Sequence, residues 1–365
     1  MPGVLIHGSK TLSLNEYPVP VVGSGQVLLE MQASALCGSD LRALYRPKTP
    51  KDFGPDGYRN VIAGHEPCGK IVQLGPNVSS SWKEGDRVIV YHIHGCGTCR
   101  NCRNGQYISC TDLDKREAYG WQRNGGHSKY ILADQADLVK LFEPLTYVDG
   151  SMIACGLGTA YAATLRADIS GRDSVLITGL GPVGLGTALL AMKEGAEVYG
   201  IELDEQRAAI ARTMGVHIVD NAKTAQDVLI QIKDTNGPSV VIDCTGHPQA
   251  RHLGLEVARE WGRVVFVGEG NTITFDVSEL VIHKSLTIYG SWVSSIAQME
   301  DLVEKLVKWN LSPEDMMVSH VFPLEEADLA YKLFDAGNTG KVVLASTAEV
   351  SRWQQKMNNR STIEN

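Results

Sequence analysis

The chain has 365 residues, 43% of them apolar and 21% charged, which is the composition of an ordinary globular protein long enough for two domains. Its net charge of −8 argues against a nucleic-acid-binding protein, and it has no run of eighteen apolar residues, so no membrane contact is expected. The N-terminus shows no basic start followed by an apolar segment, so a cytoplasmic location is predicted.

Short strand-like segments fill the first part of the chain. Glycine and proline separate them, and no long helical period intervenes. They are QVLLEMQASAL (26–36), CGKIVQLG (68–75), DRVIVY (86–91) and SKYILA (128–133). This pattern predicts a compact β-rich domain over residues 1–155.

Four cysteines lie within fifteen residues of this domain, with the spacing C-x2-C-x2-C-x7-C: Cys96, Cys99, Cys102 and Cys110. One looping segment of this kind can place four thiolates around a tetrahedral ion at about 2.3 Å. Because no ligand position remains for substrate or water, we predict a structural zinc in a lobe at residues 94–111. Two local disulfides and an iron–sulfur cluster are the alternatives, although cytoplasmic cysteines favour metal or catalytic use over disulfides.

Strand-like and helical segments alternate over residues 156–294. The strand-like segments are SVLITGLG (174–181), EVYGIE (197–202), SVVIDCTG (239–246) and GRVVFVGEG (262–270). Helical stretches separate these segments, so the region predicts an α/β domain with a doubly wound parallel sheet. Two helical stretches and the strand-like KVVLAS follow within residues 295–346, and the polar tail at 347–365 is expected to be frayed.

The first of these strands runs into a G-x-G-x-x-G fingerprint that also opens a helix: Gly179, Leu180, Gly181, Pro182, Val183 and Gly184. The glycines allow a tight turn, close approach of a pyrophosphate and packing of helix on strand. Glu202 ends the second strand, where an acid binds both ribose hydroxyls and repels a 2′-phosphate, so NAD is favoured over NADP. A helix-packing glycine motif without a nucleotide is the alternative.

Further metal-binding residue types are scattered through the chain. Cys37, Cys155 and the pair His65–Glu66 lie far apart in sequence. On their own, the cysteines could be small core residues and His65 an ordinary hydrogen-bonded histidine.

The segment GHEPCGKIVQLGPNV (64–78) resembles the zinc signature of the zinc-dependent medium-chain dehydrogenase/reductase family, and the similarity runs from about Val4 to Leu344. CGSD (37–40), GDRV (85–88), the four-cysteine lobe, Cys155 and the fingerprint occur in the family's order. The resemblance implies a GroES-like β-barrel catalytic domain built from residues 1–155 and 295–346. It also implies a Rossmann cofactor domain at 156–294, with the active site in the cleft between them.

The same resemblance implies a second, catalytic zinc bound by Cys37, His65 and Cys155, with Glu66 as a nearby or exchanging ligand. Two thiolates and an imidazole leave one position open for a substrate oxygen, whose pKa the metal lowers before hydride passes to NAD. Ser39 would accept the hydroxyl proton. Asp40 would fix the tautomer of a ligand such as His65.

The resemblance also assigns expected roles to several other residues of this chain. Arg207, Val267 and Lys341 are expected at the cofactor, with Arg207 near the adenosine ribose and Lys341 near the pyrophosphate; both charges could instead be solvated. Cys68 and Cys244 match no ligand of the family. Four residues are expected to face the substrate, and their polar groups favour a polyol, sugar or sugar acid over a simple aliphatic alcohol: Arg42, Tyr45, His92 and Trp292.

One departure from the family concerns proton transfer. Many members have a histidine where this chain has Arg42, and arginine stays protonated, so it cannot accept the proton. Arg42 could instead bind a sugar-acid carboxylate. By analogy we expect a homodimer or homotetramer. The alternatives are a dehydrogenase of a simple aliphatic or aromatic alcohol, an NADPH-linked carbonyl reductase, a zinc-free reductase of enones or quinones, and a zinc-binding protein without activity.

Overall fold

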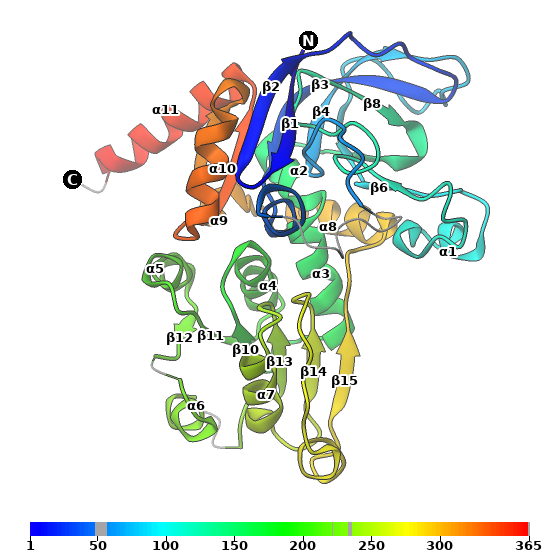
Figure 1. Ribbon diagram of the computed structural model, residues 1–365. Coiled ribbons are helices and arrows are strands. Elements are labelled where there is room, and N and C mark those ends of the chain that lie inside the picture. The colour runs from blue at the N-terminus through cyan, green and yellow to red at the C-terminus, as the bar shows by residue number, and fades with distance from the viewer. Residues whose placement is uncertain (48–56, 221, 233–235, 364–365) are drawn as a thin grey trace. The chain divides into compact units, whose positions relative to one another are not determined.

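The computed structural model describes residues 1–47, 57–220, 222–232 and 236–363. The chain divides into two compact units, residues 1–158 with 294–365 and residues 159–293 (Figure 1). None of the helices in the described residues is long and apolar enough to cross a membrane.

The first unit is built on a seven-stranded sheet in the order β16-β17-β3-β4-β5-β9, with β8 paired to β3. Two small hairpins, β1–β2 and β6–β7, accompany it. The strands are β1 (Pro2–Gly8), β2 (Thr11–Glu16), β3 (Gln26–Ala35), β4 (Pro67–Leu74), β5 (Arg87–Val90), β6 (Ile93–His94), β7 (Glu117–Ala118), β8 (Tyr130–Asp134), β9 (Leu138–Lys140), β16 (Val318–Pro323) and β17 (Lys341–Ala345). The expected β-rich unit is therefore present, and the C-terminal strands complete its sheet.

Short helical turns and longer helices connect these strands. A π-helical turn, η1 (Asp40–Tyr45), follows β3, and α3 (Gly156–Ala167) leads from the first unit into the second. The others are α1 (Arg100–Arg103), η3 (Tyr107–Ser109), η4 (Gln135–Asp137), α2 (Tyr147–Ile153), α8 (Ile296–Lys308), α9 (Glu314–Met317), η6 (Leu324–Glu326), α10 (Ala327–Ala336) and α11 (Thr347–Ile363).

The expectation of a frayed tail is wrong, because residues 347–363 form the helix α11 (Figure 1). Arg352 and Lys356 on this helix pair with the buried carboxylate of Glu314, at 2.6 and 3.1 Å. Val350 is buried against the sheet, where it joins a cluster that includes Val343. A mostly polar helix is thus held by the apolar side chains of Val350 and Trp353 and by a buried acid far away in sequence.

The second unit contains a six-stranded sheet in the order β12-β11-β10-β13-β14-β15, and every pair in it is parallel. This confirms the predicted doubly wound sheet. Chain order reverses between β10 and β13, where ligands of such folds bind outside the carboxyl ends of the strands. The elements are β10 (Ser174–Thr178), α4 (Pro182–Lys193), β11 (Glu197–Ile201), α5 (Glu205–Met214), β12 (His217–Ile218), α6 (Ala225–Gln231), β13 (Val240–Asp243), α7 (Pro248–Val257), β14 (Arg263–Phe266), η5 (Ser278–Ile282) and β15 (Thr287–Gly290).

Candidate active site and metal centres

The antiparallel pairing of β3 and β4 assembles the expected catalytic metal site. Ser34 near the end of β3 lies opposite Pro67 at the start of β4, so the residues beyond these strand ends come together. Cys37 follows β3, His65 and Glu66 precede β4, and Cys155 joins them from the turn between α2 and α3. One ligand atom from each of these four residues lies within 4.8 Å of all the others. The structure therefore brings together the four residues that the resemblance named.

Asp40 organises two of these four residues. Its side chain is fully buried, and its Oδ1 lies 2.7 Å from Nδ1 of His65. Its other oxygen accepts a hydrogen bond from the backbone N–H of Cys37, at 3.0 Å. A carboxylate at Nδ1 keeps the proton there and leaves Nε2 free to bind a metal. Ser39 Oγ lies 3.4 Å from that Nε2, so the hydroxyl sits beside the metal-binding atoms.

The two cysteines of this site differ in acidity. The pKa of Cys37 lies well below its ordinary value, chiefly because the Cys155 thiol donates a hydrogen bond to it. Burial opposes this effect, and the neighbouring His65 and Lys341 reinforce it. The pKa of Cys155 is raised, since it donates that hydrogen bond and is buried. Thiolates are the form that binds metals, so Cys37 is prepared for this role.

Lys341 lies inside the first unit, next to Glu66. Both side chains are buried, and Nζ of Lys341 is 2.6 Å from Oε2 of Glu66. Burial raises the pKa of Glu66 to about 8, while the ammonium of Lys341 opposes the rise. The other oxygen of Glu66 accepts a 3.3 Å hydrogen bond from the backbone of Gly156, next to Cys155. The sequence did not indicate this ion pair, and the contact of Lys341 with a pyrophosphate stays a prediction.

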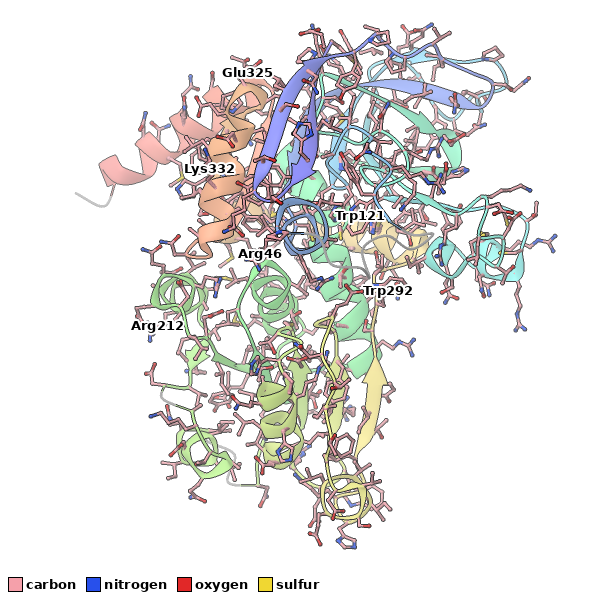
Figure 2. The ribbon with its side chains drawn as sticks, in the orientation of Figure 1. Arg46, Trp121, Arg212, Trp292, Glu325 and Lys332 are labelled. Carbon is pink, nitrogen blue, oxygen red and sulfur yellow. The ribbon has the colours of Figure 1, made fainter. Side chains whose placement is uncertain are left out.

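The four residues expected at the substrate have different surroundings. Tyr45 is fully buried in the hydrophobic core of the first unit, with its ring 5.2 Å from that of Tyr331. The turn η1 places Tyr45 in this core, and its contact with a substrate stays a prediction. Arg42 is exposed on the same turn, and Trp292 is 58% exposed in the second unit (Figure 2).

His92 lies directly at the metal site. Its ring centroid is 5.5 Å from that of His65, and its Nδ1 lies 2.7 Å from the carbonyl oxygen of Ala154, the neighbour of Cys155. Burial lowers the pKa of His92 to about 4, so the ring is neutral and Nδ1–H is the donor. The rings of Trp121 and His65 meet in a T-shaped arrangement with their centroids 6.4 Å apart, and no pattern in the sequence indicated this neighbour.

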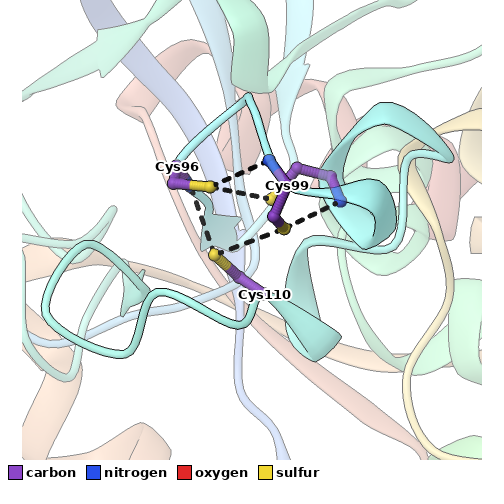
Figure 3. Close-up of side chains that lie close together, drawn as sticks. Cys96, Cys99 and Cys110 are labelled. Atoms are coloured by element: carbon purple, nitrogen blue, oxygen red, sulfur yellow. Dashed lines mark hydrogen bonds between the residues drawn. The ribbon is translucent and has the colours of Figure 1, made fainter.

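The four cysteines of residues 94–111 form a second cluster, in which one sulfur from each lies within 4.8 Å of the others. Backbone N–H groups of Cys99 and Cys102 point at the sulfurs of Cys96 and Cys99, at 3.3 and 3.5 Å, and Figure 3 shows part of this network. The first of these bonds is the main reason why the pKa of Cys96 is lowered, and the second lowers the pKa of Cys99 to about 5.

The spacing of these sulfurs fits a tetrahedral ion. The sulfur atoms of Cys96 and Cys102 are 3.9 Å apart, and those of Cys99 and Cys110 are 4.0 Å apart. Four Zn–S bonds of about 2.3 Å in a tetrahedron place the sulfurs about 3.8 Å apart, whereas a disulfide needs about 2.05 Å. All four cysteines are free, so the disulfide alternative is not realised.

The glycine fingerprint has the predicted tight geometry. Gly179 directly follows β10 with a positive φ of 81°. A Cβ on Gly184 would lie 1.9 Å from the carbonyl oxygen of Gly179, so only a glycine fits there. Nothing lies within 4 Å of a Cβ built on Gly181, so the backbone there is open to a ligand. Pro182 starts α4, whose free N–H groups can bind a phosphate.

Glu202 follows β11 and is almost fully buried. Its Oε1 lies 2.9 Å from Nη2 of Arg207 and accepts hydrogen bonds from the backbone of Leu203 and Asp204, and its Oε2 accepts one from Leu180. Burial raises its pKa, but Arg207 and these N–H groups prevail and lower it. Glu202 is therefore ionised at neutral pH and also holds the fingerprint loop in place.

Comparison with known proteins shows in which family this arrangement of residues occurs. Residues 23–143 match the family model of the alcohol dehydrogenase GroES-like domain, and residues 182–308 match that of zinc-binding dehydrogenases. The chain is 43% identical over 349 residues to the uncharacterized zinc-type alcohol dehydrogenase-like protein YphC of Escherichia coli, covering 94% of this chain and 98% of that protein.

The chain belongs to the zinc-type alcohol dehydrogenases. This confirms the expected GroES-like domain and the resemblance that predicted it. Two further relatives have named substrates. An L-threonine 3-dehydrogenase of Pyrococcus horikoshii is 32% identical, with 90% of this chain and 94% of that protein aligned. A sorbitol dehydrogenase of Halalkalibacterium halodurans is 29% identical, with 93% and 96% aligned. The protein is therefore an oxidoreductase that uses zinc and a nicotinamide cofactor.

Proposed function

We propose that this protein is an NAD-linked, zinc-dependent dehydrogenase that converts a secondary alcohol of a polyol, sugar or sugar acid to the carbonyl compound. One catalytic and one structural zinc per chain belong to this proposal. The observation that carries it is the cluster of Cys37, His65 and Cys155, with the His65 tautomer fixed by the buried Asp40.

Different residues of the chain would bind the zinc and take up the proton of the reacting hydroxyl. Zinc held by Cys37, His65 and Cys155 would supply a Lewis acid that acidifies the alcohol, and the nicotinamide would accept the hydride. Ser39 Oγ, beside His65 Nε2, is placed to accept the hydroxyl proton. Arg42 cannot take that proton onward because it stays protonated.

The ionised Glu202 supports NAD as the cofactor. Its carboxylate lies at the carboxyl end of β11, the position that meets the adenosine ribose in doubly wound sheets. A 2′-phosphate placed there would be repelled by the negative charge. Arg207 Nη2 lies 2.9 Å from Oε1 of Glu202 and helps to keep the acid ionised.

Steady-state kinetics with NAD and NADP test this proposal. The wild type should prefer NAD, and Glu202→Ala should narrow the ratio of the two kcat/KM values by roughly tenfold or more, since about 1.4 kcal/mol corresponds to a factor of ten. Glu205→Ala is the matched control, because Glu205 lies in the first turn of α5 but is largely exposed and pairs with Arg212. A wild-type preference for NADP contradicts the proposed cofactor.

The preference for a polyhydroxylated substrate draws support from His92 beside the metal ligands and from the similarity to a sorbitol dehydrogenase. A panel of polyols, sugar acids, L-threonine and unbranched aliphatic alcohols tests it. Polyols or sugar acids should show the highest kcat/KM, and L-threonine or an aliphatic alcohol in first place contradicts the assignment. A homodimer or homotetramer remains a prediction that light scattering tests.

A further inference from the structure

Asp243 occupies a special position in the second unit. It is the last residue of β13, and its register partner is Thr178, the last residue of β10. These two strands flank the point where the chain order of the sheet reverses. Asp243 is 1% exposed, so a buried acid marks the carboxyl-end crevice of the sheet.

The two carboxylate oxygens of Asp243 serve different groups. Oδ1 accepts hydrogen bonds from Thr178 Oγ1 at 3.1 Å, from the backbone N–H of Thr245 at 2.9 Å and from Thr245 Oγ1 at 2.5 Å. Oδ2 accepts hydrogen bonds from the backbone N–H of Gly246 and from Nε of Arg251, both at 3.1 Å. The carboxylate therefore ties the turn after β13 to the end of β10.

Arg251 extends this network to the next strand. It lies on α7, its side chain is 11% exposed, and its guanidinium donates to the carbonyl oxygens of Gly268 and Gly270, the latter at 3.0 Å. Both glycines follow β14. The ion pair of Asp243 and Arg251 thus connects the end of β13 to the loop after β14.

The loops after β10, β13 and β14 pack closely against one another. A Cβ on Gly179 would lie 2.5 Å from Cγ2 of Thr245, and a Cβ on Gly268 would lie 2.1 Å from the backbone nitrogen of Gly246. The three loops therefore touch one another without spare room. A shift of the Thr245–Gly246 backbone must displace the loop after β14, which it meets backbone to backbone, whereas the closest contact of Gly179 is only the side-chain methyl of Thr245.

We propose that Asp243 and Arg251 are positioning residues for the nicotinamide half of the cofactor. Doubly wound sheets bind a dinucleotide across the crevice at the reversal point, with one mononucleotide on each half of the sheet. Glu202 belongs to the half formed by β10 and β11, so the loops after β13 and β14 belong to the half that receives the nicotinamide. This inference rests on the nicotinamide cofactor of the proposed function.

Asp243→Asn tests the inference with little change in volume. An amide offers one acceptor and one donor group, so whichever oxygen position the amide NH2 takes, it faces N–H donors there. Isothermal titration of the zinc-loaded full-length protein with NADH and with AMP separates the two halves of the cofactor. NADH should bind roughly ten- to hundredfold more weakly, while the Kd for AMP should stay within about twofold.

Asp173→Asn provides the matched control. Asp173 lies at the opposite, amino end of the same sheet, just before β10, where it is nearly buried and pairs with Arg263 at the start of β14. It also accepts a 2.7 Å hydrogen bond from Ser239 Oγ. This variant should lose thermal stability and keep the wild-type Kd for both NADH and AMP.

Arg251→Lys covers the case in which Asp243→Asn does not fold, because it keeps the charge but lacks the forked donors for Gly268 and Gly270. It should also weaken NADH binding and spare AMP. The inference is overturned if the folded variants bind NADH like the wild type, if NADH and AMP weaken equally, or if Asp173→Asn weakens NADH as much. A wild type that binds NADPH and not NADH instead refutes the proposed cofactor, and the same comparison then uses NADPH.

Discussion

Replacing Asp40 by asparagine should disable the catalytic metal site without removing a ligand. The buried carboxylate accepts one hydrogen bond from His65 Nδ1 and one from the backbone of Cys37. An amide oxygen can accept only one of them, so the amide NH2 faces the other. If it faces His65, the proton moves to Nε2, the atom that must bind the metal.

The size of this effect follows from the two contacts. In the Asp40→Asn variant the amide would keep one hydrogen bond and lose the other, and a hydrogen bond to a charged group contributes about 1.5–3 kcal/mol. At about 1.4 kcal/mol per factor of ten, the loss corresponds to roughly ten- to hundredfold in metal affinity or activity. Outer partners of metal-binding histidines typically have effects of this size.

Zinc analysis after dialysis against graded chelator, together with kcat per bound zinc, measures the change. Asp137→Asn is the matched control, because Asp137 is also fully buried and lies 2.8 Å from a histidine nitrogen, that of His94, without touching the catalytic cluster. It should lower stability but leave kcat unchanged. Wild-type zinc retention and kcat in Asp40→Asn would refute the reasoning.

Two further predictions concern the structural cluster and the C-terminal helix. Cys99→Ala should lower the zinc content from two ions to one per chain and reduce thermal stability. Cys37→Ala should also lose one zinc, and it should lose all turnover but keep the wild-type melting temperature. Full activity in Cys37→Ala would contradict the assignment of the catalytic site. Glu314→Gln should destabilise the protein at pH 7 by about 1–2 kcal/mol, a figure reduced for the partial exposure of Arg352 and Lys356. Burial raises the pKa of Glu314, but Arg352 and its other partners lower it overall, so the stabilisation is present above the unfolded pKa of about 4.3 and is lost as the pH falls through the folded value. Urea unfolding of both proteins at pH 7 and pH 3.5 should show the difference shrink in acid, and a constant difference would contradict this origin.

Features encoded by residues close together in sequence were predicted well. The four cysteines of residues 94–111 need only one loop to meet, and the fingerprint needs only the junction of β10 and α4. Apolar runs and helical periods alternate along residues 174–270, so the parallel sheet was also predictable. In each case the physical cause lies within a few residues or in a regular repeat.

Tertiary structure decided the features that depend on residues far apart in sequence. Only the pairing of β3 with β4 shows that Cys37 meets His65, and the sequence by itself left these residues open until a family resemblance grouped them. Neighbouring residues in the sequence gave no indication of three other features: the ion pair of Lys341 with Glu66, the core position of Tyr45 and the anchoring of α11 by Glu314. A side chain's partner across the fold depends on how strands pack, and charge or polarity in the sequence does not specify which buried neighbour satisfies it.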